Sequence, residues 1–204
     1  IENNESKNKF IILNSLLKLR QIANHPNLLD KVGTYTSGKF EDIKAYLSVL
    51  IQGDHKVLIF SSFTSHLELL ANWLKSEQIK YLSLTGNTKV SDREHIVDQF
   101  QNQLDIKLFL ISIKAGGVGL NLTSASYIVI MDPWWNPYTE KQAISRAHRM
   151  GQSKPVHVMR FITKNSIEQK IILIQKDKLS ISEELLEMDD MPSWISEHLS
   201  ELID

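Results

Sequence analysis

The chain has 204 residues and a mass of 23.4 kDa, the size of one domain or of a domain with a short appendage. Its content of 42% hydrophobic and 23% charged residues excludes a disordered chain, and the lack of cysteine excludes disulfides, thiolate metal sites and cysteine nucleophiles. The formal net charge is −1, but residues 179–204 hold eight acids and no Lys or Arg, so residues 1–178 carry a balance of +7. That excess fits a nucleic-acid surface and also a solvated lysine-rich face.

The first quarter of the sequence predicts two amphipathic helices. The first covers residues 6–24 and ends at His25-Pro26, because a residue before proline disfavours the helical conformation. Its predicted apolar face consists of Phe10, Leu13, Leu17 and Arg20, with Leu16 and Leu19 widening it. A loop from Asp30 to Ser37 follows, and then a second helix over residues 39–51.

From residue 57 onward, short apolar segments alternate with helical ones. The predicted strands are 57–60, 81–84, 108–111, 127–131 and 156–162, and the predicted helices between them are 65–76, 92–101 and 140–149. This alternation indicates βαβ units, and therefore an α/β fold with a doubly wound, mainly parallel sheet covered by helices on both faces. From Ser166 we expect a long helix with Ile167, Ile171 and Ile174 on one stripe, followed by acidic coil. The expected organisation is an N-terminal helical segment (1–55), a core (56–163), and a C-terminal helix with an acidic tail (164–204).

Loops that follow strands are the places to look for chemistry, because ligands of such sheets bind at the carboxyl ends of the strands. One of these loops is glycine-rich, Ala115-Gly116-Gly117-Val118-Gly119-Leu120-Asn121. Its glycines would let the backbone approach a phosphate closely, or would simply form a tight turn. It is not a P-loop, because no Gly-Lys-Ser/Thr follows at the required spacing.

Two other segments have incomplete signatures of an ATPase. Residues 33–40 have the glycine spacing and the lysine of a P-loop, but Phe40 replaces the hydroxyl residue and no strand precedes them. Ser37 as the N-cap of the next helix is the simpler interpretation. Asp132 ends a strand as a magnesium-binding aspartate would, but without a P-loop it is better explained as a turn residue before Pro133.

Two of the five arginines, Arg146 and Arg149, lie three residues apart in a segment that we expect to be helical. On a helix they would share a face with Gln142, and two guanidinium groups pointing together suit the binding of phosphoryl oxygens. The alternative is a solvated face or an ion pair, for example with Glu140.

Adjacent tryptophans follow the fourth strand, and Trp134 and Trp135 cannot both point inward. We expect one to lie in the core and the other to be exposed to a base, a sugar or another domain. The seven histidines lack paired ligand spacing, so we expect no metal site.

In this order, the segments resemble the second RecA-like lobe of the Swi/Snf-type DNA translocases, within helicase superfamily two. The resemblance covers residues 16 to about 175. The matching stretches are Leu19 to Pro26, Ser37-Gly38-Lys39, Val57 to Ser61 (motif IV), Leu84 to Thr88 with Arg93 (motif IVa), Ser112 to Thr123 (motif V), Asp132 to Pro137 (motif Va) and Gln142 to Gln152 (motif VI).

The resemblance implies a role for each matching residue. Arg146 and Arg149 correspond to the motif VI arginines that reach the ATP phosphates across the cleft between two lobes. Nucleotide binding, or its coupling to DNA, falls to Gln142, Gly117, Gly119 and Asn121. The expected contacts with DNA are Ser61, Ser62, Lys114, Ala115, Gly116 and Trp135. The helix from Ser166 corresponds to a brace that returns toward the first lobe.

The implied protein is half of an ATP-dependent translocase on double-stranded DNA, related to chromatin remodellers or to repair and transcription motors. ATP and Mg²⁺ would be held mainly by the first lobe, so we expect this chain to be inactive as an ATPase on its own. We expect no membrane partner and an intracellular location, in a bacterial or archaeal cytoplasm or in a eukaryotic nucleus. The alternative is a non-catalytic module that binds DNA or docks a protein, supported by the basic core and the two tryptophans.

Overall fold

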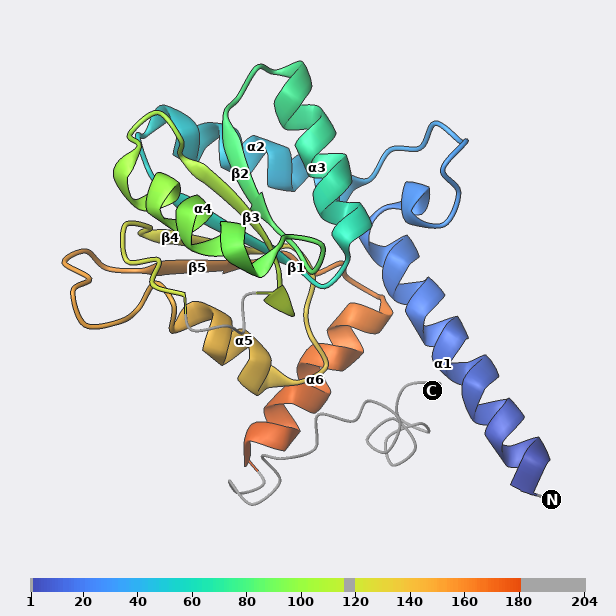
Figure 1. Cartoon of the computed structure of the whole chain (residues 1–204). Helices are drawn as coiled ribbons and strands as arrows, with labels where there is room; N and C mark the ends of the chain where they lie inside the picture. The colour runs from blue at the N-terminus through green and yellow to red at the C-terminus, as the bar shows by residue number, and fades with distance from the viewer. Residues whose placement is uncertain (1, 116–119, 181–204) are drawn as a thin grey trace.

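The computed structural model describes residues 2–115 and 120–180, and its central feature is a parallel sheet flanked by helices (Figure 1). All five predicted strands are confirmed. In chain order the elements are α1 (Glu2–Asn24), the 3-10 helix η1 (Pro26–Leu28), α2 (Gly38–Gln52), β1 (Val57–Ser61), α3 (Thr64–Ser76), β2 (Tyr81–Leu84), α4 (Val90–Asn102), β3 (Leu108–Ser112), β4 (Tyr127–Ile130), α5 (Pro137–Ile144), β5 (His157–Arg160) and α6 (Ile167–Ser180).

The strands lie in the order β2-β3-β1-β4-β5, and all neighbours are parallel. Strand β1 is central: its Val57 pairs with Leu108 of β3 on one side and with Tyr127 of β4 on the other. From β1 the chain leaves toward the β2 edge, whereas from β4 it leaves toward the β5 edge on the other side. The carboxyl ends of β1 and β4 therefore form the topological switch point, where open α/β sheets bind their ligands.

Alternate strand residues point to opposite faces of the sheet, and each face has its own core. On one face, Leu58 and Phe60 of β1 pack with Phe100 of α4 and Ala143 of α5. On the other face, residues of β1 pack with α2 and α3, including Ile43, Leu47, Leu67 and Leu70. The RecA-like, doubly wound α/β fold is thus confirmed. Buried residues of α2 belong to the core on one face of the sheet, so this helix packs directly on the sheet. The predicted domain boundaries at residues 55 and 163 stay predictions.

Helices α1 and α6 lie beside the sheet (Figure 1). Between them is a third core, which contains Trp135. The stripe of Ile167, Ile171 and Ile174 is confirmed, since all three side chains are buried there. The predicted face of α1 was wrong in part: Leu16 and Arg20 are buried, whereas Phe10 is 69% and Leu17 40% exposed. Apolar spacing alone marked too wide a stripe, because only the turns of α1 beside α6 and Trp135 are covered.

Helix α5 corrects the prediction of a helix over residues 140–149. It begins earlier, because Asn136 accepts a hydrogen bond from the Tyr138 N–H as an N-cap and Pro137 takes the first helical position. It ends at Ile144, and the N–H of Arg146 then bonds to the Ala143 carbonyl three residues back. The following residues turn as far as Gly151, whose φ of 100° is readily adopted only by glycine. Arg146 and Arg149 therefore do not share a helical face.

Among the helices of the described part, none combines the length and the apolar character needed to cross a membrane.

Candidate nucleic-acid and nucleotide interface

The predicted DNA contacts that the structure describes gather at the carboxyl edge of the sheet. Ser61 is the last residue of β1 and Ser62 follows it, and Lys114 and Ala115 come after β3. Lys114 is exposed, Ser62 is half-buried, and Ser61 and Ala115 are buried. Gly116, Gly117 and Gly119 lie outside the described residues, so their predicted contacts stay predictions.

Asp132 lies at the centre of this edge, directly beyond β4, and it is fully buried. Its carboxylate accepts hydrogen bonds from the hydroxyls of Ser61 and Ser62 and from the Ser62 N–H, 3.1 Å from Oδ1. Burial by itself would raise the pKa of Asp132, but the neighbouring His66 and Arg20 and the hydrogen bond from Ser61 lower it to about 2. Asp132 is therefore an ionised group that organises β1 and β4, which is a larger role than the predicted turn cap.

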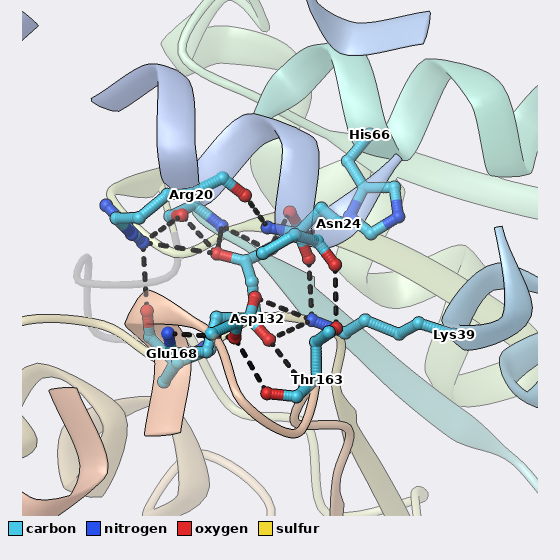
Figure 2. A network of polar contacts seen from close by, with 12 residues as sticks. Arg20, Asn24, Lys39, His66, Asp132, Thr163 and Glu168 are labelled. Carbon is cyan, nitrogen blue, oxygen red and sulfur yellow. Dashed lines mark hydrogen bonds and ion pairs between the residues drawn. The ribbon is translucent and has the colours of Figure 1, made fainter. Parts of the chain in front are cut away.

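Arg20 of α1 is the cation that compensates Asp132 (Figure 2). Its Nη2 lies 3.5 Å from Asp132 Oδ1 and donates to Ser62 Oγ and to the Pro133 carbonyl, both at 2.9 Å. The guanidinium carbon also lies 4.9 Å from the ring centre of Phe63 and 5.2 Å from that of Trp135. Burial lowers the pKa of Arg20, and the negative charge of Asp132 opposes this lowering. The spacing of residues in α1 predicts Arg20 on the buried face, but nothing in the sequence indicates its partners.

Lys39 and Glu168 form a second buried ion pair, next to the first in Figure 2. Lys39 Nζ lies 2.7 and 2.8 Å from the two Glu168 oxygens and 2.7 Å from Asn24 Oδ1. Glu168 also accepts the Thr163 N–H at 2.9 Å, and the Thr163 hydroxyl donates to the Ala23 carbonyl. This cluster joins α1, α2 and α6.

These contacts argue against the P-loop-like interpretation of residues 33–40. Ser37 is confirmed as the N-cap of α2, since its hydroxyl accepts the Phe40 N–H. The three hydrogens of the Lys39 ammonium group face three protein acceptors, and the group is buried. Lys39 therefore holds α6 against α1 and α2, and a nucleotide phosphate would have to displace Glu168 to reach it.

The predicted nucleotide-binding residues that the structure describes lie in α5 (Gln142), in the turns after it (Arg146 and Arg149) and in the loop before β4 (Asn121). Arg146 is half-buried, while Arg149, Gln142 and Asn121 are exposed. The backbone joins the two segments, because the Leu122 N–H donates to the Arg146 carbonyl at 3.0 Å. Gln152, which sequence analysis did not single out, adds side-chain hydrogen bonds to the carbonyls of Thr123 at 2.9 Å and Ala125 at 2.8 Å. Motifs V and VI thus lie side by side.

One of the two tryptophans lies in the core, as expected, and it is Trp135. Its side chain is 7% exposed and packs against Leu16 and Ile171 between α1 and α6. Trp134 is half-buried, with the Lys114 ammonium nitrogen 6.0 Å from its ring centre. The predicted contact of Trp135 with DNA stays untested, and its burial removes it as support for a protein-docking surface.

Glu140 provides a further link between α5, β5 and α6. Its buried carboxylate accepts hydrogen bonds from the Trp134 N–H at 2.8 Å, from Arg160 Nε at 3.0 Å and from Gln175 Nε2 at 3.1 Å. Helix α6 is therefore fixed to α2 at Glu168 and to α5 at Gln175. Within residues 2–115 and 120–180, His, Asp and Glu side chains form no group able to hold a metal ion.

Comparisons with known proteins agree with this geometry. Residues 38–151 match the model of the helicase conserved C-terminal domain. The ATP-dependent helicase FUN30 of Saccharomyces cerevisiae is 40% identical over 191 residues, which are 89% of this chain and 17% of that protein. A rat SWI/SNF-related regulator of chromatin, of subfamily A containing DEAD/H box 1, is 42% identical over 154 residues, which are 76% of this chain and 15% of that protein.

Two solved structures extend the match to three dimensions. The C-terminal part of the Fun30 ATPase domain has a TM-score of 0.71 at 38% identity, covering 92% of this chain and 62% of that one. The Sulfolobus solfataricus SWI2/SNF2 ATPase core in complex with dsDNA has a TM-score of 0.77 at 32% identity, covering 96% and 42%.

The family model spans more than half of the chain, which therefore belongs to the helicase conserved C-terminal domain family. Within this family it is a C-terminal lobe of the Swi2/Snf2 type of superfamily two, as its homologues show. The chain spans about a sixth of the length of the curated relatives it matches.

Proposed function

We propose that this chain is the second motor lobe of an ATP-dependent translocase that moves along double-stranded DNA. The observation that carries the proposal is that motifs V and VI are adjacent. The Arg146 carbonyl accepts the Leu122 N–H, so the turns over residues 145–151, which we call the arginine turn, adjoin the loop that follows β3. The similarity to an archaeal SWI2/SNF2 core in complex with dsDNA supports duplex DNA as the track. Chromatin is the proposed setting, since one relative is named a regulator of chromatin.

In this proposal the nucleotide site is shared between two lobes. The first lobe would hold ATP and Mg²⁺, and closure of the cleft would bring Arg146 and Arg149 to the phosphates. Phosphoryl transfer depends mainly on positioning and on stabilising charge, which permanently charged guanidinium groups supply. An arginine finger contributes about 10³–10⁵ in rate, or roughly 4–7 kcal/mol of barrier. Gln142 and Asn121, both exposed nearby, are proposed to assist nucleotide binding.

The DNA would bind along the carboxyl edge of the sheet. Ser62 and Lys114 are accessible there, whereas Ser61 is fully buried and would act by positioning its neighbours. Contacts of this kind reach phosphates and not base edges, so binding should have little sequence specificity and strong salt dependence. Repeated closing and opening of the cleft would shift this grip along the duplex.

The test is to replace Arg146 or Arg149 with alanine in the two-lobe protein. We expect DNA-stimulated ATP hydrolysis to fall by about 10³-fold or more, with duplex binding retained. Arg146→Lys keeps the charge but loses the planar fork, so it should restore only part of the rate. Lys75→Ala, which removes an exposed charge from α3, is the control and should have wild-type turnover. Wild-type turnover in both arginine variants would refute the assignment.

A further inference from the structure

The hydrogen-bond donors at the end of β1 all point to one acceptor, Asp132. The hydroxyls of Ser61 and Ser62 bond to its two oxygens, and the Ser62 N–H lies 3.1 and 3.3 Å from them. A carboxylate with a pKa of about 2 is ionised at neutral pH and can only accept, so the serines are the donors in each of these bonds. A DNA phosphate is also an anion that only accepts, and it needs the same donors.

The hydrogen of the Ser62 hydroxyl is held in place from two sides. Arg20 Nη2 donates to Ser62 Oγ at 2.9 Å, so this oxygen accepts from Arg20 and its single hydrogen points to Asp132. Ser61 is fully buried, and its oxygen also accepts the Phe63 N–H at 3.1 Å. Ser62 is half-buried, so it is the serine of this pair that an incoming phosphate can reach.

We propose that Asp132 is a positioning residue that competes with a DNA phosphate for the hydroxyl hydrogen of Ser62. The inference rests on the proposed DNA contact of Ser62 and adds that this contact forms only when Ser62 leaves Asp132. Arg20 lies 3.5 Å from Asp132 and is also held by the Pro133 carbonyl, so it stays in place and balances the carboxylate when Ser62 turns away. This competition weakens the contact between Ser62 and the DNA phosphate, so that the contact breaks easily.

The experiment measures duplex affinity of the full-length protein at one fixed salt concentration. Asp132→Asn should tighten binding by about three- to tenfold, the effect of one net hydrogen bond, because a neutral amide holds the Ser62 hydroxyl less strongly. Asp105→Asn removes the same charge from an exposed residue paired with Lys80, beyond α4 and before β3, and should leave affinity unchanged within about twofold. An unchanged or weaker affinity in folded Asp132→Asn overturns the proposal.

A double-mutant cycle with Ser62→Ala separates competition from a merely structural role. Ser62→Ala alone should weaken duplex binding, and Asp132→Asn should give no gain in that background. A gain that persists without Ser62 overturns the proposal, since it would come from the loss of charge alone. If Ser62→Ala leaves affinity unchanged, both the inference and the Ser62 contact fail, while DNA-stimulated ATP hydrolysis by the wild-type protein still tests the proposed motor function separately.

Asp132→Asn leaves Arg20 buried without its carboxylate, which can prevent folding. The double variant Arg20→Met/Asp132→Asn removes both charges and serves as the second test. It keeps the net charge of the wild-type protein and should bind duplex DNA more tightly than the wild type, and this gain should again disappear with Ser62→Ala. Equal affinities of the wild type and the double variant overturn the proposal.

Discussion

At the scale of single residues, buried charges dominate the structure at the carboxyl edge. Lys39 and Glu168 lie 2.7 Å apart with side chains that are 6% and 0% exposed. Bringing two such charges out of water has a high cost, and the geometry compensates it by adding Asn24 and the Thr163 N–H as further partners. The pair is therefore far more sensitive to loss of one member than a surface ion pair.

We predict that Lys39→Met destabilises the 204-residue chain by about 3–5 kcal/mol, because it leaves the Glu168 carboxylate buried without a cation. Lys39→Met/Glu168→Gln should recover part of this loss. Unfolding in urea, followed by circular dichroism, measures both changes.

The matched control for this prediction is Lys80→Met. Lys80 and Asp105 are as close, at 2.6 Å, but their side chains are 68% and 59% exposed. Such pairs contribute about 0–1 kcal/mol. Equal losses in Lys39→Met and Lys80→Met would contradict the importance of burial.

His66 gives the stability of the lobe a dependence on pH. Its side chain is fully buried, and neither ring nitrogen has a hydrogen-bond partner among the described residues. The distance from His66 Nδ1 to Asp132 Oδ2 is 3.9 Å. Burial lowers the pKa of His66 below its ordinary value near 6.5, although Asp132 opposes this. The stability from the neutral ring is thus complete above pH 6.5 and is lost as the pH falls toward the folded-state pKa.

We predict that His66→Gln reduces the loss of unfolding free energy between pH 7.5 and pH 5. Asp132 stays ionised throughout this window. Burial and the neighbouring His66 lower the pKa of His25, so His66→Gln also weakens the lowering at His25 and changes the slope in the same direction. Urea unfolding at several pH values measures the slope, with exposed His95→Gln as the control. An unchanged slope in His66→Gln would show that the ring does not titrate on unfolding.

The partners of these residues could not be predicted from sequence. Arg20 and Asp132 are 112 positions apart and Lys39 and Glu168 129 apart, and no local spacing connects them. Asp132 was recognised as the residue that ends a strand, but its ionic role depends on which strands are neighbours.

At the scale of elements, the strands were predicted correctly because short apolar runs mark them clearly in the sequence. The inner strands β1, β3 and β4 are short apolar runs that are buried on both faces apart from half-buried Tyr127. The edge strand β2 is mostly half-buried, and it was predicted with its observed bounds. Helix α5 was extended too far because Gln142, Arg146 and Arg149 fit a helical period, whereas the helix ends at Ile144 and the Arg146 carbonyl accepts the Leu122 N–H from the loop before β4.

We predict that Gln152→Ala, in the two-lobe protein, lowers the kcat of DNA-stimulated ATP hydrolysis by about 10- to 100-fold. The side chain of Gln152 holds the arginine turn to the carbonyls of Thr123 and Ala125, and its loss would misplace Arg146 and Arg149. Steady-state kinetics should show the effect in kcat at saturating ATP and DNA. Exposed Gln103→Ala is the control, and a normal kcat in Gln152→Ala would exclude this positioning role.

At the scale of the whole molecule, the chain is a C-terminal lobe of the Swi2/Snf2 type, which we propose to be one half of a motor. We predict negligible ATP hydrolysis by residues 1–204 alone, with or without duplex DNA, because Lys39 is bound to Glu168 and the groups proposed to hold ATP belong to the first lobe. A phosphate-release assay measures this, with the two-lobe protein as the positive control. Robust Mg²⁺-dependent turnover by the isolated chain would refute the division of the site between lobes.

The α/β class followed from the alternation of strands and helices, but the strand order did not. The order β2-β3-β1-β4-β5 places β1 beside β4 and so brings Ser61 and Ser62 to Asp132. Right-handed crossovers restrict the possible topologies without selecting one of them.

The contact between Lys39 and Glu168 also has a consequence for synthesis on the ribosome. Lysine 39 emerges 129 residues before its partner, which is roughly 6 to 26 seconds at 5–20 residues per second. During that interval α2 can pack against the nascent sheet only without the carboxylate that pairs with Lys39, which has Asn24 as its remaining partner. The last step of folding is therefore expected to wait for the arrival of α6, and nascent chains that stall before residue 168 should be preferred substrates for chaperones and proteases.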